Sequence, residues 1–348
     1  MSSEPPTHGD EALQDSAGRE RGEEPANLEA VASGALMPGS VLASILDRLP
    51  PDERHYLRLG PDASAVSATR ILDDDWFDEQ IRLRGLIWGI EDRFTLGTLW
   101  WYSASNWIVL PTVASMFLAD RVLSPRLEDV ALHWRPDSRI PGATSSALLE
   151  GSGIDELGAT LDAVIGVLAS RLSRSEPQDP PGRVHGSAHA PAADLASREP
   201  AHVPVANPAC GEPAHARAAD LAGRESAHVP VANPPSGQHR REERRLWSMA
   251  VDSLANRLLW LGTVTGEQER AQQVARDLVA ALGRPGVPAP RFTTLTDLPE
   301  GARDVWVRRG SCCLLYHVPG HANCADCPRL RPSERETRLR DRALHGDH

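Results

Sequence analysis

Four of the chain's five cysteines stand within sixteen residues near its C-terminal end, in the pattern C-C-x10-C-x2-C. They are Cys312, Cys313, Cys324 and Cys327. Pro319 and Gly320 lie between the two pairs and favour a turn that folds the second pair back onto the first. Four thiols held this closely can bind a metal ion or an iron–sulfur cluster, so this segment is expected to fold around such a centre.

Three kinds of thiol site compete for this pattern. A [2Fe–2S] cluster most often takes four cysteine thiolates. Structural zinc also accepts four, usually as two C-x2–4-C pairs, but only Cys324 and Cys327 have that spacing, and adjacent cysteines in an extended chain point to opposite sides. A redox dithiol C-x-x-C opens a helix in a βαβ setting, which the sequence does not offer. The donor set favours an iron–sulfur cluster and leaves zinc open.

The charge of the chain is concentrated at its N-terminal end. The formal net charge is −11, and the first 30 residues hold eight acidic residues against two arginines. This stretch is nearly free of large apolar residues, so we expect residues 1–30 to be disordered. The remainder is close to neutral, which argues against a nucleic-acid-binding protein, because phosphate neutralisation requires a basic face.

The first residues are acidic and polar, with no basic segment followed by an apolar run, so no secretory signal is predicted. Clustered cysteines without such a signal indicate metal chemistry in a reducing cytosol rather than a disulfide framework. The predicted location is therefore cytoplasmic, and it includes peripheral association with the inner face of the membrane.

A Pro-, Ala- and His-rich stretch over residues 176–240 interrupts the chain. It contains a tandem duplication, in which 18 of 21 positions of Ala188–Pro208 recur 26 residues later in Ala214–Pro234. Two copies without an apolar face cannot stack into a solenoid. We therefore expect a solvated, disordered linker.

Apolar residues at steps of three and four predict helices on both sides of the linker, over 154–172, 246–261 and 267–282, with a shorter one over 41–49. Strand patterns are few and cover Val130–Trp134 and Asp304–Val307. The prediction is a mainly α fold with minor β content (α+β). Its parts are a helical region over 31–175, a second over 241–300, a cluster-binding segment over 301–330 and a flexible tail over 331–348.

Phe94–Ala119 runs for 26 residues without a charge, which is long enough to cross a bilayer. Several Ser, Thr and Asn side chains lie within it, Pro111 interrupts it, and Trp107 stands mid-span rather than at an interface. These marks favour a buried pair of helices broken at Pro111 over a transmembrane helix.

The residues that flank the cysteines extend the pattern. Arg308 and Arg309 precede the first pair, and Asp326 stands inside the second pair. This run closely resembles the R-R-x-C-C-x10-C-x-D-C signature of FhuF-type ferric-siderophore reductases. The chain departs from it by placing both Gly310 and Ser311 between the arginines and the first cysteine.

The resemblance continues more weakly upstream. Leu246-Trp247-Ser248 resembles the family's L-W-[SG]-N helix, although Met249 stands where the family usually has Asn. Leu99–Pro111 resembles its central apolar helix. With the linker set aside, the likeness extends from about residue 93 to residue 330.

The resemblance implies a [2Fe–2S] cluster whose irons are bound by Cys312, Cys313, Cys324 and Cys327, with no catalytic residue beyond the cluster. It implies one-electron reduction of a ferric siderophore, which releases Fe(II). No dinucleotide-binding fingerprint is present, so the expected electron donor is another protein, such as a ferredoxin. Arg308 and Arg309 would form a positive rim that contacts this donor or the siderophore.

An alternative from another class stays open at this stage. The cysteines of a non-catalytic binding or regulatory protein would hold structural zinc or a sensing iron–sulfur site. The colour of the protein distinguishes the reductase from the zinc form of this alternative, because zinc proteins are colourless.

Overall fold

The computed structural model describes residues 37–173, 237–299 and 304–345. The predicted disorder of residues 1–30 lies outside these ranges, and so does the predicted linker from residue 176 to residue 236. The prediction also assigns residues 237–240 to the linker, but they form the start of a helix, so it is wrong for them. The helices are α1 (Pro38–Arg48), α2 (Asp74–Trp88), α3 (Arg93–Ile108), α4 (Leu110–Leu118), α5 (Ile154–Ser173), α6 (Gly237–Thr265), α7 (Gln268–Leu282) and α8 (Pro332–His345). Short 3-10 turns cover Arg54–Tyr56, Ala68–Leu72 and Leu315–His317.

The strands are short and form three small antiparallel sheets. They are β1 (Ser64–Ser67), β2 (Val122–Leu123), β3 (Val130–Trp134), β4 (Gly142–Ser145), β5 (Leu148–Leu149), β6 (Arg291–Thr294) and β7 (Val305–Arg308). The described sheets have the orders β1-β3-β4, β2-β5 and β6-β7. The predicted mainly helical fold with minor β content is confirmed, and β3 has the predicted bounds.

The charge-free stretch forms two buried helices, as predicted. α3 ends at Ile108 and α4 begins at Leu110, so Pro111 lies in the first turn of α4, where the missing N–H costs no helical hydrogen bond. Trp101 Nε1 of α3 donates to the Leu246 carbonyl at 3.0 Å, which ties this helix to α6. Among the helices that the structure describes, none is long and apolar enough to cross a membrane.

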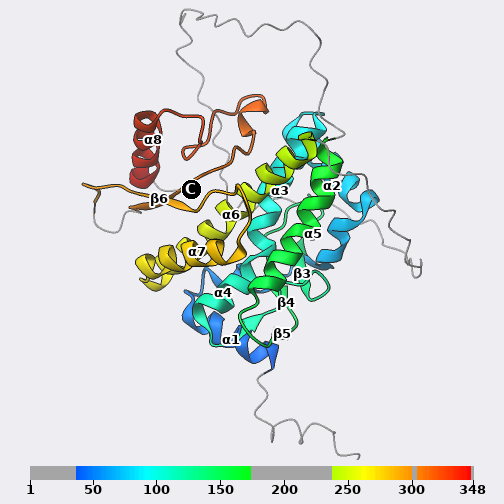
Figure 1. Ribbon diagram of the computed structural model, residues 1–348, viewed down its shortest axis with the longest axis vertical. Helices are drawn as coiled ribbons and strands as arrows, with labels where there is room; N and C mark the ends of the chain where they lie inside the picture. The colour runs from blue at the N-terminus through cyan, green and yellow to red at the C-terminus, as the bar shows by residue number, and fades with distance from the viewer. Residues whose placement is uncertain (1–36, 174–236, 300–303, 346–348) are drawn as a thin grey trace, which may run out of the picture. The chain divides into compact units, whose positions relative to one another are not determined.

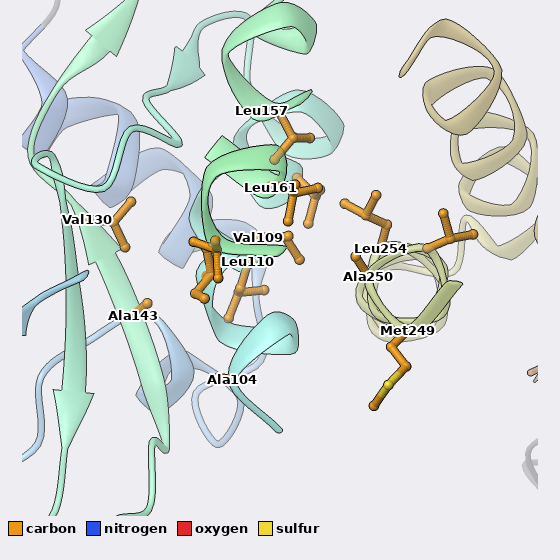
Figure 2. Close-up of a cluster of buried hydrophobic side chains, with 14 of the residues drawn as sticks. Ala104, Val109, Leu110, Val130, Ala143, Leu157, Leu161, Met249, Ala250 and Leu254 are labelled. Carbon is orange, nitrogen blue, oxygen red and sulfur yellow. The ribbon is translucent and has the colours of Figure 1, made fainter. Parts of the chain in front are cut away.

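Helix α6 lies at the centre of the packing. It contacts α3, α4, α5 and α7, and it also contacts β7, which leads into the cysteine segment (Figure 1). Figure 2 shows Ala250 and Leu254 of α6 on the side of the helix that faces Leu157 and Leu161 of α5. α6 therefore joins the helical core to the C-terminal segment that holds the four thiols.

The C-terminal residues differ from the prediction. The sequence predicts a flexible tail over 331–348, but Pro332–His345 forms α8. Leu339 of α8 is 2% exposed and packs with Leu295 and Trp306. The predicted flexible tail is therefore wrong for the described residues. The sequence did not indicate a helix here, because one buried leucine in a highly charged segment does not produce an apolar periodicity.

Arginine side chains also tie α8 to the loops beside it. Arg338 Nη1 donates to the Asn323 carbonyl at 2.7 Å, and Arg335 Nη1 donates to the Cys327 carbonyl at 3.4 Å. Asn323 precedes the second cysteine pair, and Cys327 is the second member of that pair. α8 therefore fixes the backbone around Cys324 and Cys327 through these two hydrogen bonds.

Candidate metal centre

The cysteine segment begins where β7 ends and reverses at a defined turn. His321 N–H donates to the Val318 carbonyl at 3.1 Å, and Gly320 has a φ of +81°. Pro at the second and Gly at the third position of such a turn are typical of type II, in which the third residue needs positive φ. The turn expected at Pro319 and Gly320 is therefore present, and it returns the chain toward the first cysteine pair.

The turn brings thiols from the two pairs together. Cys313 Sγ lies 3.6 Å from Cys324 Sγ, and none of the four cysteines forms a disulfide. Cys313 and Cys327 are buried, while Cys312 and Cys324 are partly exposed. The pKa of Cys312 is raised, first by burial and then by the charges of Cys327 and Cys313. All four thiols thus belong to one site with a buried side and an accessible edge.

Arg309 is the cation of this site. Its Nη1 donates to Cys324 Sγ at 3.4 Å and lies 3.7 Å from Asp326 Oδ1, and its guanidinium lies 4.2 Å from the ring centre of Tyr102 in α3. The side chain is 1% exposed. The expectation that Arg309 contacts a partner at the surface is wrong, because packing against α3 and the second cysteine pair buries it. Arg308 is exposed, as a surface contact requires.

Asp252 of α6 holds the loop that precedes the first cysteine. Its Oδ1 accepts the Gly310 N–H at 2.9 Å, and its Oδ2 accepts the Ser311 N–H at 3.0 Å and the Ser311 hydroxyl at 2.6 Å. The carboxylate is also 3.9 Å from Arg309 Nε. Burial raises the pKa of Asp252. The positive charge of Arg309 and the hydrogen bonds from Gly310 and Ser311 act in the opposite direction and reduce this rise.

The sequence prediction did not include Asp252, which lies 58 residues before Gly310. An available signal was the departure from the family pattern, because Gly310 and Ser311 are the two residues that this carboxylate holds. The extra residue between the arginines and Cys312 therefore has a structural partner in α6.

One thiol of the site, that of Cys313, is biased toward the charged form that ligands require. The pKa of Cys313 falls to about 5, because Cys324 donates a hydrogen bond to it and Arg309 stabilises its thiolate. The pKa of Cys324 is raised, because it gives that hydrogen bond and is buried. Metal ligands of this type are thiolates, so the site holds one ligand deprotonated at neutral pH before any metal binds.

The donor set fits a [2Fe–2S] cluster. Such a cluster takes two thiolates on each iron, and this site has a close pair, Cys313 and Cys324, beside Cys312 and Cys327. Four thiolates outweigh the positive charge of the cluster core, and Arg309 supplies a buried positive charge with an N–H aimed at sulfur. Over the described ranges, no three His, Cys, Asp or Glu side chains are grouped as ligands of one metal ion.

Two histidines of the segment lie beside the thiols. His317 is exposed and packs edge-on against Tyr316, with ring centres 4.4 Å apart. His321 packs edge-on against Trp88 at the end of α2, with ring centres 5.2 Å apart. In the structure, both histidines contact aromatic rings.

The family comparison agrees with this geometry. Residues 309–329 match the family model of the FhuF 2Fe-2S C-terminal domain. The thiol segment is therefore similar to the FhuF 2Fe-2S C-terminal domain. No curated protein and no solved structure is significantly similar to the chain. The FhuF match covers Arg309, all four cysteines and Asp326, so the buried arginine and its acid belong to the same unit as the thiols.

Proposed function

We propose that this protein is a ferric-siderophore reductase, in which Cys312, Cys313, Cys324 and Cys327 would hold a [2Fe–2S] cluster that would supply one electron for the reduction of bound Fe(III). The observation that carries the proposal is the thiol site itself. Cys313 and Cys324 lie 3.6 Å apart, Arg309 donates to Cys324, and the segment is of FhuF type. This type indicates the siderophore reductase family.

The chemistry needs one electron and no bond rearrangement in the protein. Siderophores hold Fe(III) through hard oxygen donors, and Fe(II) is bound far more weakly by such ligands. When bound, an all-cysteine [2Fe–2S] cluster supplies a one-electron donor, at about −400 mV in the plant-type ferredoxins. Each electron given to Fe(III) is replaced by one from a protein donor, so iron is reduced and the donor is oxidised.

The exposure of the thiols supports transfer at the surface. Cys312 and Cys324 are partly exposed, whereas Cys313 and Cys327 are buried. A siderophore complex is too large to enter the closely packed body of the protein. It can approach the accessible edge while the buried thiols keep solvent from the other side of the site.

Spectroscopy on anaerobically purified protein tests the cofactor. We expect a red-brown protein that is bleached by dithionite and then shows the EPR signal of a reduced [2Fe–2S] cluster. Cys313→Ser is expected to lose the colour. A colourless wild-type protein with one bound zinc per chain would refute the proposal and support the structural zinc alternative.

Trapping of Fe(II) tests the activity. Protein reduced with dithionite and freed of excess reductant is mixed with a ferric siderophore and a ferrous chelator. We expect about one Fe(II) per cluster, because each reduced cluster carries one electron. A protein that holds the cluster but releases no Fe(II) from any siderophore is not a reductase of this kind.

A further inference from the structure

Two exposed arginines face each other across the hairpin that leads into the thiol site. β6 pairs with β7 so that Arg291 stands directly opposite Arg308. Both side chains are exposed, and in the described part of the chain neither forms an ion pair or a hydrogen bond. Side chains directly opposite on antiparallel strands have Cβ atoms about 4.5–5.5 Å apart, and like charges there are destabilising. The hairpin therefore carries a repulsion that no described carboxylate relieves.

The two arginines lie on the side of the hairpin that packs against α8. Successive side chains of a strand point to opposite faces. The next cross-strand pair, Phe292 and Val307, packs with the main helical core. Trp306, which shares a face with Arg308, packs instead with Leu339 of α8. Figure 1 shows α8 beside β6. The arginines therefore point to the α8 side of the hairpin and away from the helical core.

Arg335 of α8 adds a third positive charge on this side. It lies one turn before Leu339, so both side chains are on the same face of the helix. Burial lowers the pKa of Arg335, and the positive charges of Arg308 and Arg291 lower it further. Among the described residues, no carboxylate lies within ion-pair distance of Arg335. Arg291, Arg308 and Arg335 together form what we call the arginine cluster.

The arginine cluster adjoins the buried side of the thiol site. Arg335 Nη1 donates to the Cys327 carbonyl at 3.4 Å, and Cys327 is 1% exposed. Asp326 also acts on Arg335, but its carboxylate lies 3.7 Å from Nη1 of the buried Arg309. The positive charge therefore stands next to a thiol that no substrate can touch. A partner that docks here can exchange an electron with the site without contacting a ligand atom.

An acidic protein surface fits the arginine cluster. Glu334 and Glu336 of α8 already pair with Arg338 and Arg340. In a chain of net charge −11, uncompensated cations at one place attract and orient a partner of opposite charge. The cluster draws its members from two strands and a helix. Separate guanidiniums of this kind complement carboxylates that are spread over the surface of a protein.

We propose that the arginine cluster docks an acidic protein electron donor, a [2Fe–2S] ferredoxin, on the buried side of the thiol site. One electron leaves the reduced donor and is taken up at the thiol site, and no bond is made or broken. The inference rests on the proposed function and gives its electron donor a surface. Because Cys312 and Cys324 are accessible at a different edge, the donor and the ferric complex need not compete for one place.

Calorimetry at low ionic strength tests the docking, with the full-length protein and an oxidised, acidic plant-type ferredoxin as the probe. We expect Arg291→Gln and Arg308→Gln each to weaken binding about threefold and the double variant to weaken it about tenfold, as exposed charge pairs do. Added salt should weaken wild-type binding and reduce its difference from the double variant, because salt screens exposed charges. Cytochrome c, a basic electron carrier, should bind more weakly than ferredoxin.

Arg276→Gln is the matched control. Arg276 is exposed, and its guanidinium carbon lies 5.3 Å from the ring centre of Phe292, which points to the other face of the hairpin. Its replacement should leave ferredoxin binding within about twofold of wild type. Arg308→Gln also removes the like charge opposite Arg291, so it should unfold at the same urea concentration as wild type or a higher one. Weaker binding by a variant of unchanged stability then reports a lost contact.

Four results would overturn the docking. They are no binding of ferredoxin by wild type, equal affinity of wild type and the double variant, tighter binding of cytochrome c than of ferredoxin, and displacement of ferredoxin by an equal concentration of inorganic phosphate. The last would identify a small-anion site instead.

The two proposals fail in different ways. Release of Fe(II) by the dithionite-reduced protein, with ferredoxin binding that does not depend on the arginine cluster, would leave the reductase and remove this surface. Ferredoxin binding that depends on the arginine cluster, without release of Fe(II) from any ferric siderophore, would leave the surface and remove the reductase.

Discussion

Asp252→Asn tests whether α6 positions the thiol site. The side chain is 4% exposed, and its two oxygens accept three hydrogen bonds, from the Gly310 N–H, the Ser311 N–H and the Ser311 hydroxyl. Asparagine has nearly the same shape but only one accepting oxygen. If that oxygen faces Ser311, the amide NH2 meets the Gly310 N–H, donor against donor.

The size of the effect follows from these contacts. One hydrogen bond to a charged acceptor contributes about 1.5–3 kcal/mol, and the unpaired N–H adds a cost of about 1–3 kcal/mol. Arg309 also loses a carboxylate 3.9 Å from its Nε, although Asp326 remains. Against this, the buried carboxylate carries a desolvation cost that the amide avoids, as its raised pKa indicates. We expect Asp252→Asn to lower the free energy of unfolding by about 3 kcal/mol.

Urea unfolding measures this loss, with Asp277→Asn as the control. Asp277 is an exposed carboxylate of α7 that accepts a hydrogen bond from Gln273, so its replacement should change the free energy of unfolding by less than about 0.5 kcal/mol. Asp252→Asn should also lose its cluster colour faster in the presence of an iron chelator. If the two variants unfold alike and lose iron at the same rate, Asp252 does not position the site.

Three further predictions follow from the described contacts. Arg309→Gln should make the midpoint potential of the cluster more negative by on the order of 60 mV, because a nearby positive charge and an N–H to sulfur favour the reduced form. A redox titration monitored by EPR measures this potential, and a positive shift would contradict the reasoning. His133 is 1% exposed, its Nε2 has no hydrogen-bond partner among the described residues, and burial lowers its pKa to about 4. The neutral ring is therefore favoured in the folded state, and its contribution to stability is complete above the unfolded pKa of about 6.5 and is lost as the pH falls toward 4, by up to roughly 3 kcal/mol. His133→Asn should show a shallower loss of stability than wild type over that range in urea unfolding, and identical slopes would exclude this role. Leu339→Ala should cost about 2–4 kcal/mol of local stability and raise amide exchange across α8; α8 amides that already exchange freely in wild type would show that this helix is not anchored.

The sequence by itself determined which four thiols form the candidate site and the course of the chain around them. The spacing of four cysteines, with a Pro-Gly turn between the pairs, is a local property that the backbone must satisfy however the rest folds. The positions of α5 and α7 followed for the same reason, because apolar periodicity is set by near neighbours in the chain. The sequence did not predict α2, and α6 begins well before the predicted residue 246. The break between α3 and α4 needed only the position of Pro111.

Only the tertiary structure decided what surrounds the thiols. Asp252 is 58 residues from the loop that it holds, and Trp88 reaches His321 from the opposite end of the described chain. No local pattern encodes such pairs, because they depend on which helix faces pack together. The burial of Arg309 against Tyr102 and the anchoring of α8 through Leu339 have the same origin. The sequence thus specified a thiol site, and the packing of α2, α3, α6 and α8 around it decided which edge is accessible and which charges lie beside it.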